Sequence, residues 1–170
     1  LYNFMDGING IAGIELVSVA LGGAVLAVLV GSPDHGVFFA TLIAAGVGFL
    51  VWNFPNARIF MGDACSGFLG VTLGLIAVWQ CAIAPELFVA WVLLLGLFLV
   101  DATVTLIRRI LRGEAFYEAH RSHAYQFASR YYGSHTPVSL SVGVINIVWL
   151  LPWAVAVTLG SLPTLLGLLL

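Results

Sequence analysis

The sequence predicts an all-α integral membrane protein, a polytopic bundle with about five membrane-spanning helices. Of its 170 residues, 61% are hydrophobic and only 8% are charged, whereas soluble domains carry about 25% charged residues. The apolar residues form continuous runs near the roughly 20 residues that a membrane-crossing helix needs, without the alternation of β-barrel strands. This composition excludes a water-soluble globule, and a net charge of −2 gives no electrostatic basis for binding nucleic acid.

The predicted spans are the longest apolar stretches. They cover Ile11–Val30, Val37–Trp52, Gly67–Ala84, Leu87–Ile107 and Val138–Gly160. Two ionisable residues fall within these stretches. Glu15 is close enough to the start of the first span to lie at the membrane interface. Asp101 is an intramembrane acid, which indicates either a functional group or a polar contact between helices.

The basic residues divide the connections between spans into two classes. All of them are arginines: Arg58, Arg108, Arg109, Arg112, Arg121 and Arg130. Because positive residues accumulate on the cytoplasmic side of a membrane, segments 1–10, 53–66 and 108–137 are predicted to share that face. The remaining connections, Gly31–Gly36 and Ala84–Glu86, are short and contain no Arg or Lys. We therefore expect a site on the cytoplasmic face of the plasma (inner) membrane.

The first segment, residues 1–10, contains Asn3, Asp6 and Asn9 with interleaved glycines. Such a loop exposes backbone amides and short polar side chains, which suits recognition of a nucleotide base or ribose. An ordinary capped loop before a helix has the same composition. Spacing alone leaves both interpretations open.

The second segment, residues 53–66, carries Asp63 directly after Gly62, at the mouth of a span. A carboxylate there can hold Mg²⁺, which typically uses one or two carboxylates together with substrate phosphates. The same residue is equally suited to cap the helix that follows. The two roles are compatible because the N-terminal end of a helix also favours bound phosphate.

The third segment, residues 108–137, contains His120 and His123, which would lie on one face if this part is helical. Arg121 and Arg130 add donors suited to phosphate oxygens. A zinc site is the rival interpretation, and it is weak because no third Cys or His lies nearby. The three arginines that begin the segment are expected to meet anionic lipid headgroups.

Three sequence strings together resemble the polyprenyl-phosphate N-acetylhexosamine-1-phosphate transferases, the WecA/MraY-like proteins of glycosyltransferase family 4. They are NxxDGxxG at Asn3–Gly10, FMGD at Phe60–Asp63 and AHRSHxYQ at Ala119–Gln126. The third string is more similar to the branch that initiates O-antigen and lipopolysaccharide synthesis than to the peptidoglycan branch. The resemblance implies about ten spans in a full family member, with residues 1–170 as the C-terminal part of its single transferase domain.

This resemblance implies transfer of an N-acetylhexosamine 1-phosphate from a UDP-sugar to a polyprenyl phosphate such as undecaprenyl phosphate, with release of UMP. It implies Mg²⁺, with Mn²⁺ as a substitute, bound at Asp63. The residues implied for substrate binding are Asn3, Asp6, Asn9 and Phe60, the last by stacking on uracil. The residues implied for catalysis are Asp63, His120, Arg121 and His123.

The sequence departs from the family pattern in three places. Cys65 stands where the family usually has Gly, and Asn9 stands where many relatives have Asp. Nothing matches the paired aspartates of the family's N-terminal half, so we expect these residues not to catalyse alone. The alternative function is a non-catalytic membrane protein that binds a nucleotide sugar or a lipid phosphate. Small residues such as those in Gly67–Gly74 can pack helices within one chain or between two, which leaves a homodimer open.

Overall fold

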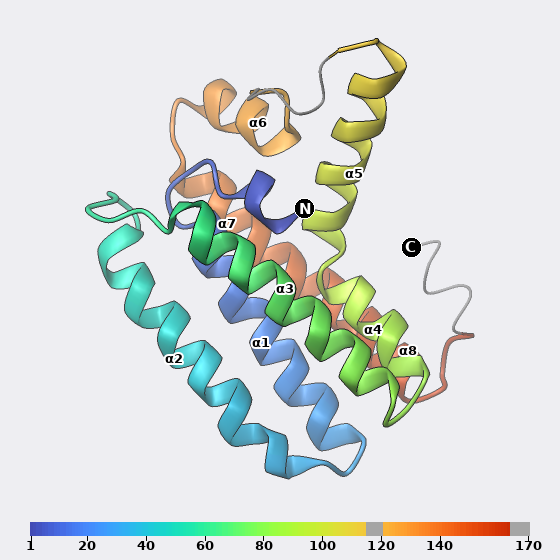
Figure 1. Ribbon diagram of the computed structural model, residues 1–170. Coiled ribbons are helices and arrows are strands. Elements are labelled where there is room, and N and C mark those ends of the chain that lie inside the picture. Colours follow the sequence, from blue (N-terminus) through green and yellow to red (C-terminus); the bar gives the residue numbers. More distant parts are fainter. Residues whose placement is uncertain (115–120, 164–170) are drawn as a thin grey trace.

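The computed structural model describes residues 1–114 and 121–163, which form helices and contain no strand (Figure 1). The helices are η1 Tyr2–Met5, α1 Ile11–Leu29, η2 Pro33–His35, α2 Gly36–Asn53, α3 Gly62–Cys81, α4 Glu86–Leu94, α5 Gly96–Leu111, α6 Ala124–Tyr132, α7 Thr136–Ile145, η3 Asn146–Leu150 and α8 Leu151–Thr158. Of the short elements, η1 and η2 are 3₁₀ turns, and η3 is a π-helical turn between α7 and α8.

The described residues confirm the predicted polytopic helical class. By length and composition, α1, α2, α3 and the unit α7–η3–α8 can each cross a membrane, and the bent pair α4–α5 makes a fifth. α1 lies in the centre of the bundle, where it contacts α2, α7, α8 and α4. Its glycines permit this, because Gly22 and Gly23 leave room for Leu94, Phe39 and Trp91 to pack against its backbone.

The span predicted over Leu87–Ile107 is bent in the structure. The chain bends by 73° between α4 and α5, at Leu95 and Gly96, where glycine weakens the helix. α4 packs against α3 and α8, whereas α5 contacts η1 and α6. The ring of Phe98 in α5 lies 5.1 Å from that of Tyr2 in η1. The bend therefore carries α5 from the bundle to the polar segments.

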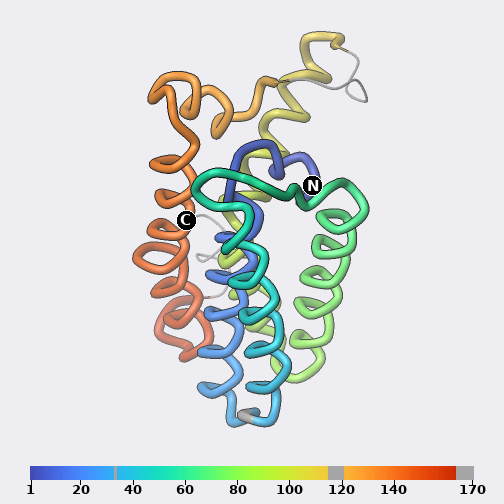
Figure 2. The backbone as a smooth tube through the Cα atoms, turned by 90° about the vertical axis from the view of Figure 1, so that its left-hand side faces the viewer, coloured from blue at the N-terminus to red at the C-terminus, as the bar shows by residue number. Residues whose placement is uncertain are grey.

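The polar segments gather at one end of the bundle, as Figure 2 shows. We call this the loop end and define it as residues 1–10, 53–66 and 121–135. The turn between α1 and α2 lies at the opposite end (Figures 1 and 2). The described residues of the three segments thus lie at one end of the bundle, and their location on the cytoplasmic face stays a prediction.

Glu15 lies near the start of α1. Glu15 is completely buried, because it lies within α1 on a side that faces the α7–η3 unit. The Nδ2 atom of Asn146 donates hydrogen bonds to Glu15 Oε2 at 2.7 Å and to Ser18 Oγ at 2.8 Å. This polar contact ties the central helix to the π-helical turn.

Candidate active site

Asn53, the last residue of α2, joins the first two segments of the loop end. Its side chain is buried. The backbone N–H of Gly10 donates to Asn53 Oδ1 at 2.6 Å, and Asn53 Nδ2 donates to the carbonyl of Ile59 at 2.7 Å. One amide therefore fixes the start of α1 against the loop that leads to α3.

Asn3 and Asn9, which the sequence predicts to bind substrate, also hold the segments together. The hydroxyl of Ser66 in α3 donates to Asn3 Oδ1. Asn9 Nδ2 donates to the carbonyl of Pro55 at 3.0 Å, and the hydroxyl of Ser139 donates to the carbonyl of Asn9 at 2.7 Å. Asn3 and Asn9 thus contribute to the shape of the loop end.

Asp6 and Asp63 both belong to the loop end. Burial, and then the negative charge of Asp63, raise the pKa of Asp6 above its ordinary value. Asp63 is exposed and lies in the first turn of α3, whose N-cap is Met61, so the interpretation of Asp63 as the N-cap is wrong. Gly62 adopts a φ of 72°, a value that glycine tolerates and that turns the chain into α3.

Phe60 lies three residues before Asp63 and is 78% exposed. Its ring is therefore accessible to a flat ligand such as a nucleobase. Two acidic side chains and one exposed aromatic ring thus belong to the loop end. Asp6 follows η1, Phe60 lies in the α2–α3 connection and Asp63 lies in the first turn of α3.

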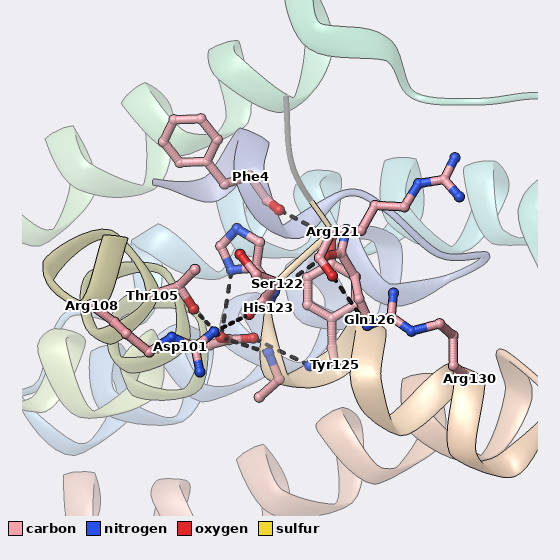
Figure 3. Close-up of polar contacts among 11 residues, drawn as sticks. Phe4, Asp101, Thr105, Arg108, Arg121, Ser122, His123, Tyr125, Gln126 and Arg130 are labelled. Carbon is pink, nitrogen blue, oxygen red and sulfur yellow. Dashed lines mark hydrogen bonds and ion pairs between the residues drawn. The ribbon is translucent and has the colours of Figure 1, made fainter. Parts of the chain in front are cut away.

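Asp101 of α5 receives several contacts from the start of α6 (Figure 3). Its Oδ1 accepts hydrogen bonds from Thr105 Oγ1 at 3.1 Å and from the N–H of Ala124 at 3.0 Å. Its Oδ2 accepts from the N–H of Tyr125 at 3.4 Å, and Oδ1 lies 3.5 Å from His123 Nδ1. The intramembrane acid of the sequence is therefore a polar contact to the third segment.

His123 lies between two aromatic side chains. Its ring is stacked with Phe4 at 6.5 Å and with Tyr125 at 5.7 Å between centroids. The Tyr125 hydroxyl donates to the carbonyl of Phe4 at 3.0 Å. Burial, and then the charges of Asp101 and Asp6, raise the pKa of Tyr125 far above its ordinary value, so this hydroxyl stays a donor.

The prediction that His120 and His123 share a helix face is wrong for His123. His123 has an extended backbone and is the N-cap of α6, where its N–H donates to Gln126 Oε1 at 3.2 Å. An extended residue cannot belong to the helical face that the spacing suggested. His120 lies outside the described residues.

The arginines of the third segment have separate places. Arg108 Nη2 donates to the carbonyl of Ser122 at 2.8 Å. Arg130 Nη2 donates to the carbonyl of Arg121 at 3.1 Å, and the side chain of Arg121 is exposed. Arg109 is buried with its guanidinium 3.0 Å from the carboxylate of Glu114, so its assignment to lipid headgroups is wrong.

A groove of about 500 Å³ lies between α5 and α6. Its walls include Leu97, Val100, Val104 and Phe127, and its polar lining includes Asp101 and Arg108. An apolar groove with a guanidinium at its wall suits a molecule with a hydrocarbon chain and an anionic head.

Sequence reasoning missed Asn53, Ser66 and Tyr125 as organisers of the site. Asn53 and Ser66 are polar residues at the ends of apolar runs, which is a weak signal that many helix ends share. Tyr125 lies within the AHRSHxYQ string. Its bond to Phe4 spans 121 positions of the chain, and no local pattern predicts such a contact.

Comparison with known proteins agrees with the motifs. Residues 1–80 match the sequence profile of glycosyl transferase family 4. Over 150 residues, the chain is 30% identical to a probable undecaprenyl-phosphate N-acetylglucosaminyl 1-phosphate transferase of Bacillus subtilis, an alignment that covers 86% of this chain and 42% of the relative. Both matches support glycosyl transferase family 4.

Other relatives in this family carry a different name. The chain is 36% identical over 121 residues to a phospho-N-acetylmuramoyl-pentapeptide-transferase of Maricaulis maris, with 62% of this chain and 32% of the relative covered. The chain thus spans less than half the length of these relatives. Because both names occur, the O-antigen branch stays a prediction. No solved structure matches the chain.

Proposed function

We propose that this chain forms part of a membrane transferase that moves an N-acetylhexosamine 1-phosphate from a UDP-sugar to a polyprenyl phosphate, such as undecaprenyl phosphate, and releases UMP. The proposed site is the loop end on the cytoplasmic face of the plasma membrane, and the proposed pathway is the start of O-antigen or lipopolysaccharide synthesis. The observation that carries the proposal is that Asp6, Asp63 and the exposed ring of Phe60 all belong to the loop end.

The acid pair fits a divalent cation, Mg²⁺ or Mn²⁺. Burial, and then the charge of Asp63, raise the pKa of Asp6, and a bound cation offsets repulsion between two carboxylates. Among the described residues, no three His, Cys, Asp or Glu side chains gather as a metal site. Mg²⁺ combines one or two carboxylates with substrate phosphates, and Asp63 is its proposed ligand. Such a cation neutralises charge on the diphosphate of a nucleotide sugar.

The other site residues have complementary roles in this proposal. Phe60 stacks on the uracil ring, and Asp6 and the Asn3 loop contact the nucleoside. The exposed guanidinium of Arg121 offsets phosphate charge, which is the main task in joining two phosphates. His123 acts beside the phosphates from the start of α6.

The groove between α5 and α6 supports a lipid acceptor. Its apolar walls suit a prenyl chain, and Arg108 suits the terminal phosphate. The proposed UDP-sugar dissolves in water and the proposed polyprenyl phosphate in the membrane. The two can therefore meet only at the boundary between the helix bundle and the loop end.

The test is Mg²⁺-dependent UMP release by membranes that contain the gene product, supplied with undecaprenyl phosphate and a panel of UDP-N-acetylhexosamines. Asp63→Asn is expected to lower UMP release by about 100-fold or more. Asp34→Asn is the matched control, because Asp34 is an exposed acid in η2 at the opposite end of the bundle. Equal activity of the two variants would contradict the role of Asp63. Binding of a UDP-sugar without UMP release would favour the non-catalytic alternative.

A further inference from the structure

We propose that Asp101 is the positioning residue of this site, and that it acts by holding the ring of His123 and the start of α6 in place. The inference rests on the proposed function, because it gives a role to a residue that acts through His123. Asp101 belongs to a different helix from His123, and the bend before α5 is what brings the two together.

The carboxylate of Asp101 completes the N-terminal end of α6. The first N–H groups of a helix have no partner within it. Here the N–H groups of Ala124 and Tyr125 both point to Asp101, one to each oxygen. A negative charge at this end of a helix is also favourable for the helix dipole. Asp101 therefore fixes the backbone that immediately follows His123.

The same carboxylate orients the imidazole ring. Asp101 Oδ1 lies 3.5 Å from His123 Nδ1, and the two side chains are 12% and 4% exposed. A carboxylate beside Nδ1 favours the tautomer with its proton on Nδ1, which leaves Nε2 as the acceptor. Figure 3 shows the second ring nitrogen of His123 on the side away from Asp101.

Two aromatic neighbours flank the ring. Phe4 and Tyr125 stack with His123, and the Tyr125 hydroxyl holds the Phe4 carbonyl. Phe4 lies between Asn3 and Asp6 in the sequence. His123 is thus positioned relative to residues 1–10 as well as to α5. Loss of the Asp101 charge would remove the contact with α5 and leave the contacts with Phe4 and Tyr125.

The test is a double-mutant cycle on UMP release with the variants Asp101→Asn, His123→Ala and their combination. Asp101→Asn keeps the size of the side chain and removes its charge. We expect it to lower kcat by about 10- to 100-fold, with the KM for the UDP-sugar changed by less than about threefold. In the His123→Ala background, the same substitution is expected to have little further effect, because Asp101 acts through the ring.

Glu114→Gln is the matched control, since Glu114 is an acid just beyond α5 that contacts Arg109 and Arg112, and we expect it to leave kcat unchanged. Asp101→Glu keeps the charge and should lower kcat less than Asp101→Asn. Multiplicative losses in the double variant, or an unchanged kcat in Asp101→Asn, would overturn the positioning role while the transferase stands. Absence of UMP release from membranes that contain the unsubstituted full-length gene product would overturn the proposed function and this inference together.

Discussion

The loop end and the helix bundle are held together by different interactions. At the loop end, single polar atoms such as the Asn53 amide and the Ser66 hydroxyl connect segments that are far apart in the sequence. In the bundle, apolar side chains pack on α1 where Gly22 and Gly23 leave room. Hydrogen bonds require particular atoms at particular distances, whereas apolar packing requires mainly the right volume. Loss of a single hydrogen-bonding atom should therefore disrupt the loop end, whereas a larger side chain at a packed glycine should destabilise the bundle.

The largest expected effect is that of Asn53→Ala. This change leaves the Gly10 N–H and the Ile59 carbonyl without their partner, and it should lower the free energy of unfolding by about 2–4 kcal/mol. UMP release should fall as well, because the two acidic segments lose their common support. Thermal unfolding in detergent measures the stability, and Asn56→Ala, at an exposed position of the same loop, is the control. Equal unfolding temperatures for the two variants would contradict the role assigned to Asn53.

The next effect tests the bundle. A Cβ atom at Gly23 would lie 2.6 Å from Phe39 and 2.8 Å from Trp91, so Gly23→Ala should destabilise by about 1–3 kcal/mol. Gly74→Ala is its matched control, because a Cβ there meets nothing within 4 Å. Alanine is the better helix former, so this control should be neutral or slightly stabilising. If Gly23→Ala is as stable as Gly74→Ala, close packing around α1 does not set the stability of the bundle.

These two regions also differ in how far the sequence predicts them. Continuous apolar runs predict the spans, since such runs have to be helical inside a membrane, and α1 begins at Ile11 as expected. The bend before α5 is not predictable from the run Leu87–Ile107, which is apolar on both sides of it. A glycine such as Gly96 permits a bend without requiring one, and the contacts of α5 with η1 and α6 form between distant parts of the chain.

The site shows the same limit. The charge pattern predicts that the segments of Asp6 and Asp63 share one face of the membrane, and in the structure both segments belong to the loop end. The contact of Asp101 with His123 depends on the bend, and the partner of Glu15 is Asn146, 131 positions away. Local spacing carries no information about either pair, so the roles of Asp101 and Glu15 could not be assigned from the sequence.

Glu15 makes a polar contact within the otherwise apolar bundle. Its substitution is expected to destabilise the protein less than Gly23→Ala does. Glu15→Leu removes the acceptor of the Asn146 amide and should destabilise by about 1 kcal/mol, as is usual for polar contacts between membrane helices. The double variant Glu15→Leu/Asn146→Leu should regain part of this loss, because no polar group is then left unpaired. Unfolding temperatures of the two single variants and the double variant measure the coupling. Strict additivity would mean that the contact contributes nothing.

The smallest expected effect is the pH dependence of Asp6→Asn. Because burial and Asp63 raise the pKa of Asp6 in the folded protein, the folded state holds this proton more tightly than the unfolded state does. The stability of the unsubstituted protein should therefore fall relative to Asp6→Asn as the pH rises from the ordinary pKa of an aspartate through the raised one, and the difference should then stay constant.

Unfolding temperatures of both proteins across this pH range measure the difference, in which the other titrating groups cancel. Mg²⁺ should raise the unfolding temperature of the unsubstituted protein more than that of Asp6→Asn, since a cation relieves the repulsion only where both charges are present. A pH-independent difference would mean that Asp6 and Asp63 do not interact in the folded protein. The acid pair would then no longer support a cation at the loop end, and only Asp63 would remain as its ligand.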